Sequence, residues 1–222
     1  MPSRRDIFVN NGIYHIYSKT IDRKLVFEEK NLCFEFLNTV NYYKSATNLR
    51  FSKYKEALNE KIIKLEKKII KPRVQILSNC LMPNHYHLQI KQLIDNGIIR
   101  FMADVLNSFT RYYNSKNKRK GPIFLTPFRS RQIVSDEQLI HTSRYIHLNP
   151  FSAGIVNTYE DLIDYPYSSF KEYVEKNEEG ICNTDEILNM FGGDRLRYKE
   201  FVLNNAEHQR TLEYIKYAKD WL

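Results

Sequence analysis

Two histidines separated by one residue, His85 and His87, stand at the start of an apolar run. The run before them, from Val74 to Leu81, predicts a β-strand, and Pro83-Asn84 between the runs has the residue types of a tight turn. Alternate residues of a strand share a face, so the two imidazoles project side by side while Tyr86 points to the opposite face. Two imidazoles on one rigid strand supply half of a metal site.

The pair alone is also compatible with two histidines on a half-exposed sheet, because two ligands do not hold a catalytic metal. Further along the chain, Tyr145 and Asn149 stand four residues apart in a predicted helix that begins at Ser135. Residues at this spacing share one side of a helix. The residue before a proline is pushed out of the α region, so Asn149-Pro150 predicts the helix end. If this helix packs beside the hairpin, Tyr145 faces the histidines and Asn149 offers a third ligand.

These residue types suit phosphoryl transfer at DNA. A divalent cation polarises the non-bridging phosphate oxygens, and a tyrosine hydroxyl can attack phosphorus and hold the strand covalently. Tyrosine ionises near pH 10, so a local cation has to assist it. From periodicity alone, a tyrosine such as Tyr145 is more often a core residue than a nucleophile. Tyr112 and Tyr113, on a predicted helix from about Asn96, are rival nucleophiles.

The chain has 222 residues, and its 34 Lys and Arg against 26 Asp and Glu give a formal net charge of +8. This excess favours a polyanionic partner, although it is also common in proteins that bind none. A basic loop ends at Gly121-Pro122, and two arginines share one face of a predicted strand at 127–134, where they can grip phosphates or form surface salt bridges. The candidate DNA contacts in these segments are Lys116, Lys118, Arg119, Lys120, Arg129 and Arg131.

The three cysteines, Cys33, Cys80 and Cys182, are widely spaced and form no CxxC pair. They predict buried thiols in a reducing cytosol rather than a disulfide framework or a zinc ribbon. The polar first residues predict no signal peptide, and no apolar run approaches the ~20 residues of a membrane span. We therefore expect a cytoplasmic protein with no membrane partner.

The predicted elements follow one another as strand, helix, inserted helix, strand, strand, helix, strand and helix. Without the inserted helix, at about 50–71, this is close to the β-α-β-β-α-β order of an α+β fold with a ferredoxin-like antiparallel sheet and helices on one face. Such a sheet leaves its other face open for a ligand. The inserted helix carries a narrow apolar seam that suits docking on the surface or contact with a partner subunit. We expect a catalytic domain at 1–157 and a C-terminal helical extension at 158–222.

Two segments together carry a resemblance to a known family: Leu81-Met82-Pro83-Asn84-His85-Tyr86-His87-Leu88 and Arg144-Tyr145-Ile146-His147-Leu148-Asn149-Pro150. They resemble the single-tyrosine HUH transposases, and most of all the REP-associated tyrosine transposases. The resemblance runs from Tyr14-His15-Ile16 through Tyr165-Pro166-Tyr167-Ser168-Ser169, which covers most of the chain. His147, two residues after Tyr145, points elsewhere on the helix and is interpreted as structural.

The resemblance implies a role for each site residue. His85 and His87 would be the HUH ligands of Mg²⁺ or Mn²⁺, and Asn149 would complete the metal site where some relatives carry glutamine. Tyr145 would be the nucleophile that forms a 5′-phosphotyrosine and releases a 3′-hydroxyl. Lys19-Thr20 stands where many relatives carry Arg-Gly, so the positive charge at this hairpin contact is kept. With Arg23 in the same loop, Lys19 joins the candidate DNA contacts.

The resemblance also implies the substrate, which is single-stranded DNA near imperfect hairpins, cut and rejoined by transesterification without ATP. Family members with one tyrosine commonly act as dimers, and monomers occur in the REP-associated branch, so a homodimer stays open. The expected location is the bacterial cytoplasm, with the nucleoid when DNA is bound.

Three functions remain open from the sequence. The first is an active single-strand transposase or nuclease, and the second is a hairpin-binding protein of the same fold that does not cut. The third is a zinc hydrolase that uses the histidine pair, but the sequence lacks a third ligand at a spacing such as that of HExxH. The presence together of His85, His87, Tyr145 and Asn149 favours the first.

Overall fold

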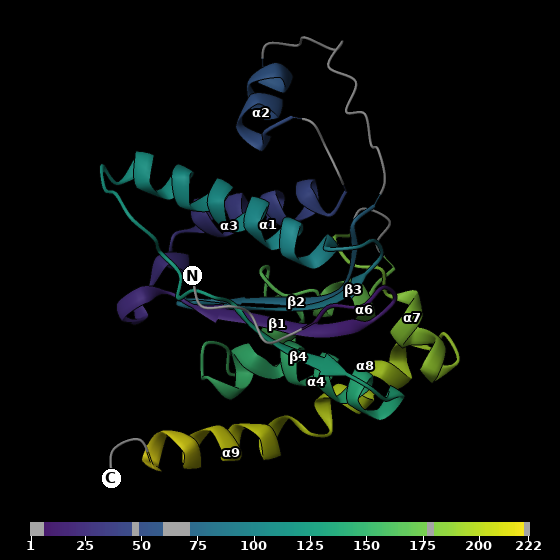
Figure 1. Cartoon of the computed structure of the whole chain (residues 1–222). Coiled ribbons are helices and arrows are strands. Elements are labelled where there is room, and N and C mark those ends of the chain that lie inside the picture. The colour runs from purple at the N-terminus through teal and green to yellow at the C-terminus, as the bar shows by residue number, and fades with distance from the viewer. Residues whose placement is uncertain (1–6, 46–48, 60–71, 177–179, 220–222) are drawn as a thin grey trace.

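The computed structural model describes residues 7–45, 49–59, 72–176 and 180–219 (Figure 1). Four strands form one antiparallel sheet in the order β2-β3-β1-β4. The strands are β1 (Ile13–Lys19), β2 (Val74–Met82), β3 (His85–Gln92) and β4 (Arg129–Ile133). In β1 and β3, apolar and aromatic residues alternate with polar ones, which suits a sheet with two different faces. The predicted α+β class with an antiparallel sheet is confirmed.

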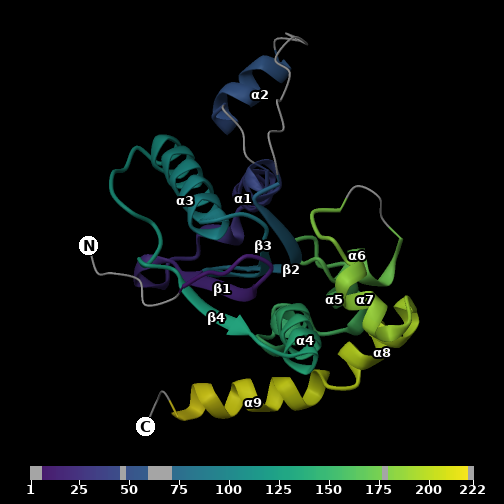
Figure 2. The same cartoon turned by 45° about the vertical axis from the view of Figure 1, so that its right-hand side comes forward.

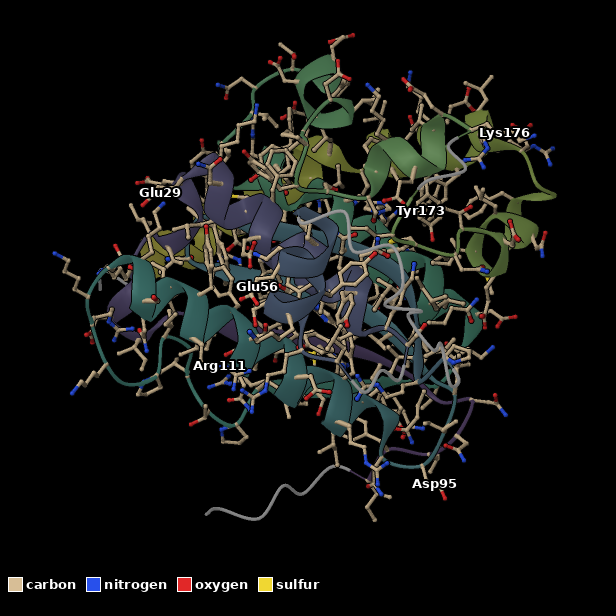
Figure 3. All side chains as sticks on the ribbon, turned by 90° about the horizontal axis from the view of Figure 1, so that it is seen from above. Glu29, Glu56, Asp95, Arg111, Tyr173 and Lys176 are labelled. Atoms are coloured by element: carbon tan, nitrogen blue, oxygen red, sulfur yellow. The ribbon has the colours of Figure 1, made fainter. Side chains whose placement is uncertain are left out.

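Helices α1 (Lys30–Tyr43) and α3 (Gly97–Lys116) cover one face of the sheet (Figure 1). Their buried Phe36 and Phe109 meet Tyr86 of β3 and the loop residue Phe124 in the main hydrophobic core. Figure 3 views the molecule from this side, where Arg111 projects from the outer surface of α3. The apolar stripes of these helices therefore pack as their helical periodicity predicts.

The two helices of the predicted β-α-β-β-α-β unit thus lie on one face, as expected, and the opposite face carries α4 (Asp136–Ser152) and the C-terminal helices (Figure 2). Helix α4 packs against β2 and β3, and α9 runs along α4 (Figure 2). A second core forms on this side, in which Leu148 and Phe151 of α4 meet Leu77 and residues of the C-terminal helices. This coverage has a physical reason, because the C-terminal helices bury apolar residues of α4 such as Leu148 and Phe151.

The remaining elements are mostly short. They are η1 (Ile21–Arg23), η2 (Val26–Glu28), α2 (Phe51–Asn59), α5 (Tyr159–Ile163), α6 (Phe170–Val174), α7 (Asp185–Leu188), η3 (Asn189–Phe191), α8 (Arg195–Leu203) and α9 (Ala206–Lys219). The rest of the predicted inserted helix, at 60–71, lies outside the described residues. Among the described helices, none has the length and apolar character needed to cross a membrane. All three cysteines are free thiols. Cys33 and Cys80 are buried as predicted, whereas Cys182 is only partly buried.

Helix α4 does not end at Asn149, as the following proline predicts, but continues through Pro150 to Ser152. Burial of Leu148 and Phe151 holds the last turn in place, so packing outweighs the local preference. After the helix, the backbone N–H groups of Ile155 and Val156 donate to the carbonyl of Pro150 at 2.9 and 3.3 Å. Tyr145 consequently lies about two turns before the helix end, rather than in the last turn.

Candidate functional site

The hairpin places the two histidines as its sequence predicts. Met82 pairs with His85, so Pro83 and Asn84 alone form the loop between β2 and β3. The rings of His85 and His87 lie on the α4 side with centroids 5.0 Å apart, at an angle of 84°. On the other face, the Tyr86 side chain is fully buried against Phe36.

Two contacts fix α4 above this pair of histidines. The Gln89 side chain accepts from the Ser78 hydroxyl at 2.8 Å and donates to the carbonyl of Leu139 at 3.0 Å, which ties the first turns of α4 to the sheet. Later in the helix, Ile146 packs on Cys80 and Met82 of β2.

This arrangement brings Tyr145 over His87, with ring centroids 5.6 Å apart and the rings perpendicular. Asn149 follows one turn later, and its Nδ2 donates to the carbonyl of Tyr145 at 2.7 Å. In the structure, α4 therefore packs beside the hairpin and Tyr145 faces the histidines, as expected.

A cavity of about 780 Å³ lies between α4, α9 and the polar face of the sheet. Eight of the candidate site residues from the sequence line this cavity, and they are His85, His87, Tyr145, Asn149, Lys19, Arg23, Arg129 and Arg131. Arg129 and Arg131 lie directly opposite Tyr17 and His15 of β1 in the strand register, so all four share this face. These eight residues thus bring two imidazoles, a phenol, an amide and four cationic side chains to one cavity.

The other four candidate DNA contacts, Lys116, Lys118, Arg119 and Lys120, do not line the cavity. They lie at the end of α3 and in the loop after it, where Lys116 forms an ion pair with Glu29. Arg119 donates to Asn114 Oδ1 at 2.8 Å. The same loop returns to β1 through a hydrogen bond from Leu125 N to the carbonyl of Lys19 at 2.9 Å. The basic loop is therefore a second cationic surface near the Lys19 end of the cavity.

The rival tyrosines belong to the other side of the sheet. Tyr113 is buried in the core formed by α1 and α3. Tyr112 packs against that core, and the Lys55 ammonium lies 5.0 Å from the centroid of its ring. Neither residue lines the cavity. Tyr145 and Tyr17 are the tyrosines that line it.

The strand β1 contributes two site residues that sequence reasoning did not select, His15 and Tyr17. His15 Nε2 lies 2.8 Å from His87 Nδ1, and the Tyr17 ring stacks on that of His87 with centroids 5.9 Å apart. Burial, helped by the nearby Arg131 guanidinium, lowers the pKa of His15 to about 4, so this imidazole is neutral at pH 7. The alternation of His15, Tyr17 and Lys19 along the strand was a usable signal for a shared face.

Helix α9 contributes two further residues to the cavity, Gln209 and Glu213. Gln209 Nε2 donates to the carbonyl of Tyr145 at 3.2 Å. Burial, followed by the negative charge of Glu213 and the nearby phenol of Tyr17, raises the pKa of Tyr145 to about 12. The phenol is therefore protonated near neutral pH. No motif marks these two positions, which reach the site through the packing of α9 on α4.

The donor atoms of the site fit a divalent cation. His85 Nδ1 lies 2.7 Å from Asn84 Oδ1, and a proton shared with this acceptor leaves the lone pair on Nε2. His87 and Asn149 line the same cavity. Across the described part of the chain, no three His, Cys, Asp or Glu side chains are arranged to hold one metal ion. An amide oxygen would therefore have to complete the set.

The structure confirms that His147 has a structural role. It is fully buried on the side of α4 away from the cavity, with Nε2 at 2.9 Å from Ser169 Oγ and Nδ1 at 2.8 Å from the hydroxyl of Tyr198. Burial lowers the pKa of His147 to about 3. Both ring nitrogens are used in this network, so the residue has a packing and hydrogen-bonding role.

Comparison with known proteins supports the fold. A solved chain described as "Structure of the REP associates tyrosine transposase bound to a REP hairpin" superimposes with a TM-score of 0.54 at 15% sequence identity. The match covers 84% of this chain and 93% of the other. No protein-family model matches the sequence, and no curated protein matches it significantly. At this identity, the similarity shows a related fold.

Proposed function

We propose that this chain is a metal-dependent transposase or endonuclease that cuts and rejoins single-stranded DNA at hairpin-containing sites. The observation that carries this proposal is the single cavity in which Tyr145 lies against His87, with Arg129 and Arg131 in the same lining. A phenol, a potential metal site and guanidinium groups are the parts that phosphoryl transfer needs. The solved neighbour, described as a tyrosine transposase bound to a REP hairpin, supports hairpin DNA as the substrate class.

His85, His87 and Asn149 would hold Mg²⁺ or Mn²⁺ through two imidazole nitrogens and one amide oxygen. A cation bound there supplies polarisation of the non-bridging phosphate oxygens and neutralises charge that develops on them. Since none of these three ligands is negatively charged, we expect modest metal affinity in the absence of DNA. The phosphate of the substrate would add the missing negative charge.

In the cutting step, the Tyr145 oxygen forms a bond to phosphorus and the bond from phosphorus to the 3′ oxygen breaks. The phenolic proton leaves the nucleophile, and the departing 3′ oxygen takes up a proton to become a hydroxyl. The 5′ end stays attached to the protein as a phosphotyrosine. Attack by another 3′-hydroxyl reverses the step and rejoins a strand, so one phosphodiester replaces another and no ATP is required.

The protein has to assist ionisation of this tyrosine, because its pKa of about 12 keeps it protonated at neutral pH. Positive charge near a phenol favours the phenolate. Arg129 and Arg131 are exposed on the cavity wall, where they can contact a phosphodiester and Tyr145 together. Tyr145 should therefore react only when metal and DNA are both bound.

The decisive experiment incubates the protein with a labelled single-stranded hairpin oligonucleotide and Mn²⁺, followed by a denaturing gel. The parent should give a covalent protein–DNA adduct, and Tyr145→Phe should give none while binding the hairpin like the parent. Loss of one hydroxyl from a partly exposed site should change stability by less than about 1 kcal/mol. Tyr112→Phe, on the opposite side of the sheet, is the matched control and should keep the adduct.

Two outcomes would contradict parts of this proposal. If Tyr145→Phe keeps the adduct and Tyr17→Phe loses it, the nucleophile lies on β1. If the parent binds hairpin DNA but forms no adduct in Mn²⁺ or Mg²⁺, the chain is a non-cleaving nucleic-acid-binding protein of the same fold.

A further inference from the structure

The contact between His15 and His87 joins two imidazole nitrogens and no carboxylate. His15 Nε2 and His87 Nδ1 are 2.8 Å apart, and the two rings are nearly parallel, with an interplanar angle of 28°. A hydrogen bond between two such nitrogens needs a proton on one and a lone pair on the other. The contact therefore couples the tautomer of His87 to that of His15.

The two arrangements of this proton have different consequences for a metal. If His15 Nε2 donates, the proton of a neutral His87 is on Nε2, and that atom cannot bind a cation. If His87 Nδ1 donates instead, its Nε2 carries the lone pair and becomes a ligand. Since His87 Nδ1 is engaged with His15, metal binding by His87 would have to use Nε2.

We propose that His15 is a positioning residue that accepts the Nδ1 proton of His87 and so fixes His87 in the tautomer that binds the metal through Nε2. This inference rests on the proposed function, because it assigns His15 a role toward the metal of that site. The partner of a metal-ligating histidine commonly sets its tautomer and ring orientation in this way.

The neighbouring histidine shows the same arrangement. His85 Nδ1 lies 2.7 Å from the side-chain oxygen of Asn84, which can only accept a proton. Each histidine thus has an acceptor at Nδ1, supplied by the hairpin loop for His85 and by β1 for His87. In both histidines a metal would then be bound through Nε2.

Two observations favour positioning over direct ligation by His15. Among the described residues, no three His, Cys, Asp or Glu side chains have an arrangement that suits one metal ion, so His15 does not form such a set with His85 and His87. In addition, Arg131 lies directly opposite His15 on β4, so a cation bound at His15 would face a guanidinium group. The 2.8 Å contact with His87 Nδ1 instead gives His15 Nε2 a partner from which it can accept a proton.

The test uses the full chain without DNA. Mn²⁺ affinity is measured by electron paramagnetic resonance for the parent, His15→Leu, His15→Gln and His87→Ala. We expect a loss of about 10- to 100-fold in His15→Leu, which has no acceptor, as for other partners of metal ligands. His15→Gln offers an amide oxygen and should restore most of the affinity, whereas His87→Ala should lose more than either. In the parent with Mg²⁺, ¹⁵N NMR should show the His87 proton on Nδ1.

Three results would overturn the inference. They are parent-like Mn²⁺ binding by His15→Leu, a His87 proton on Nε2, or pulsed resonance spectra that show three coordinated imidazoles in the parent. If His15→Leu does not fold, the parent NMR spectrum and the His15→Gln affinity still decide. Adduct formation with hairpin DNA separates the two proposals. If any of these three results is obtained and the adduct still forms, only the role of His15 is rejected. If Mn²⁺ binding by the parent does not depend on His87, both proposals are rejected.

Discussion

The two faces of the sheet are built from the same strands, yet they differ in almost every property. In β1 and β3, the residues on the α1/α3 face are Tyr14, Ile16, Ser18, Tyr86, Leu88 and Ile90, and all are buried. The intervening residues face α4, and they are His15, Tyr17, Lys19, His85, His87 and Gln89. Period-two alternation alone separates the sets.

This difference shows how a small sheet combines stability with chemistry. On the first face, two amphipathic helices exclude water and form the main hydrophobic core. On the second face, α4 covers part of the sheet and leaves a cavity of about 780 Å³ beside its polar residues. Substitutions on the first face should therefore affect folding, and those on the second should affect metal binding and catalysis.

The largest effect on the polar face should come from His87→Ala. Removing this imidazole takes away one of the two proposed nitrogen ligands, so we expect cutting of a hairpin oligonucleotide to be abolished. Binding of the same oligonucleotide should remain within a few-fold of the parent, because Arg129, Arg131 and Lys19 are unchanged. Gel-based cleavage and fluorescence anisotropy measure the two properties. Undiminished cleavage would refute the metal assignment.

On the apolar face, Phe109→Ala should have the opposite profile. Phe109 is fully buried and contacts Phe27, Phe36 and Phe124, so its truncation leaves a cavity in the core. We expect the free energy of unfolding to fall by about 3–5 kcal/mol, measured by urea denaturation. The folded fraction should still form the adduct. A cost below about 1 kcal/mol would show that this face does not carry the stability.

Local patterns were sufficient for the parts of the site that lie within single elements. The strand at Ile13–Lys19, the hairpin and the shared face of Tyr145 and Asn149 follow from alternation, turn chemistry and helical spacing. Each of these depends on residues close together in the chain, so the sequence alone contains the necessary information.

Long-range packing was not predictable in the same way. His15 enters the site because β1 pairs with β3, and Gln209 and Glu213 enter it because α9 packs on α4. The coverage of the second face and the continuation of α4 through Pro150 depend on the same tertiary contacts. None of these contacts has a signature in local spacing.

His147 allows the buried polar network on the α4 side to be tested by pH. Its pKa is lowered to about 3 in the folded protein, against about 6.5 in the unfolded chain. Below pH 6.5 the unfolded state binds a proton that the folded state does not. Stability should therefore fall as the pH is lowered toward 3, by up to about 1.4 kcal/mol per pH unit.

In His147→Gln this contribution disappears, so the slope of unfolding free energy against pH should become shallower by up to that amount. Chemical denaturation between pH 7 and pH 4.5 measures both slopes. His15, whose pKa is lowered to about 4, leaves a slope of the same sign in the variant. Equal slopes for parent and variant would mean that His147 is not held neutral by its surroundings.

The smallest expected effect is on salt dependence, which compares cations on the two faces. If the candidate DNA contacts neutralise about four phosphates of a single strand, log K should fall against log salt with a slope near −3. Arg129→Gln, in the cavity, and Lys118→Gln, in the basic loop, should each make that slope shallower by about 0.7. Arg111→Gln removes an equally exposed charge from α3 on the other side and should leave the slope unchanged. Anisotropy titrations at several salt concentrations give these slopes. An unchanged slope in Lys118→Gln alone would confine the DNA contact to the cavity, and a flat dependence for the parent would exclude backbone contact by both groups.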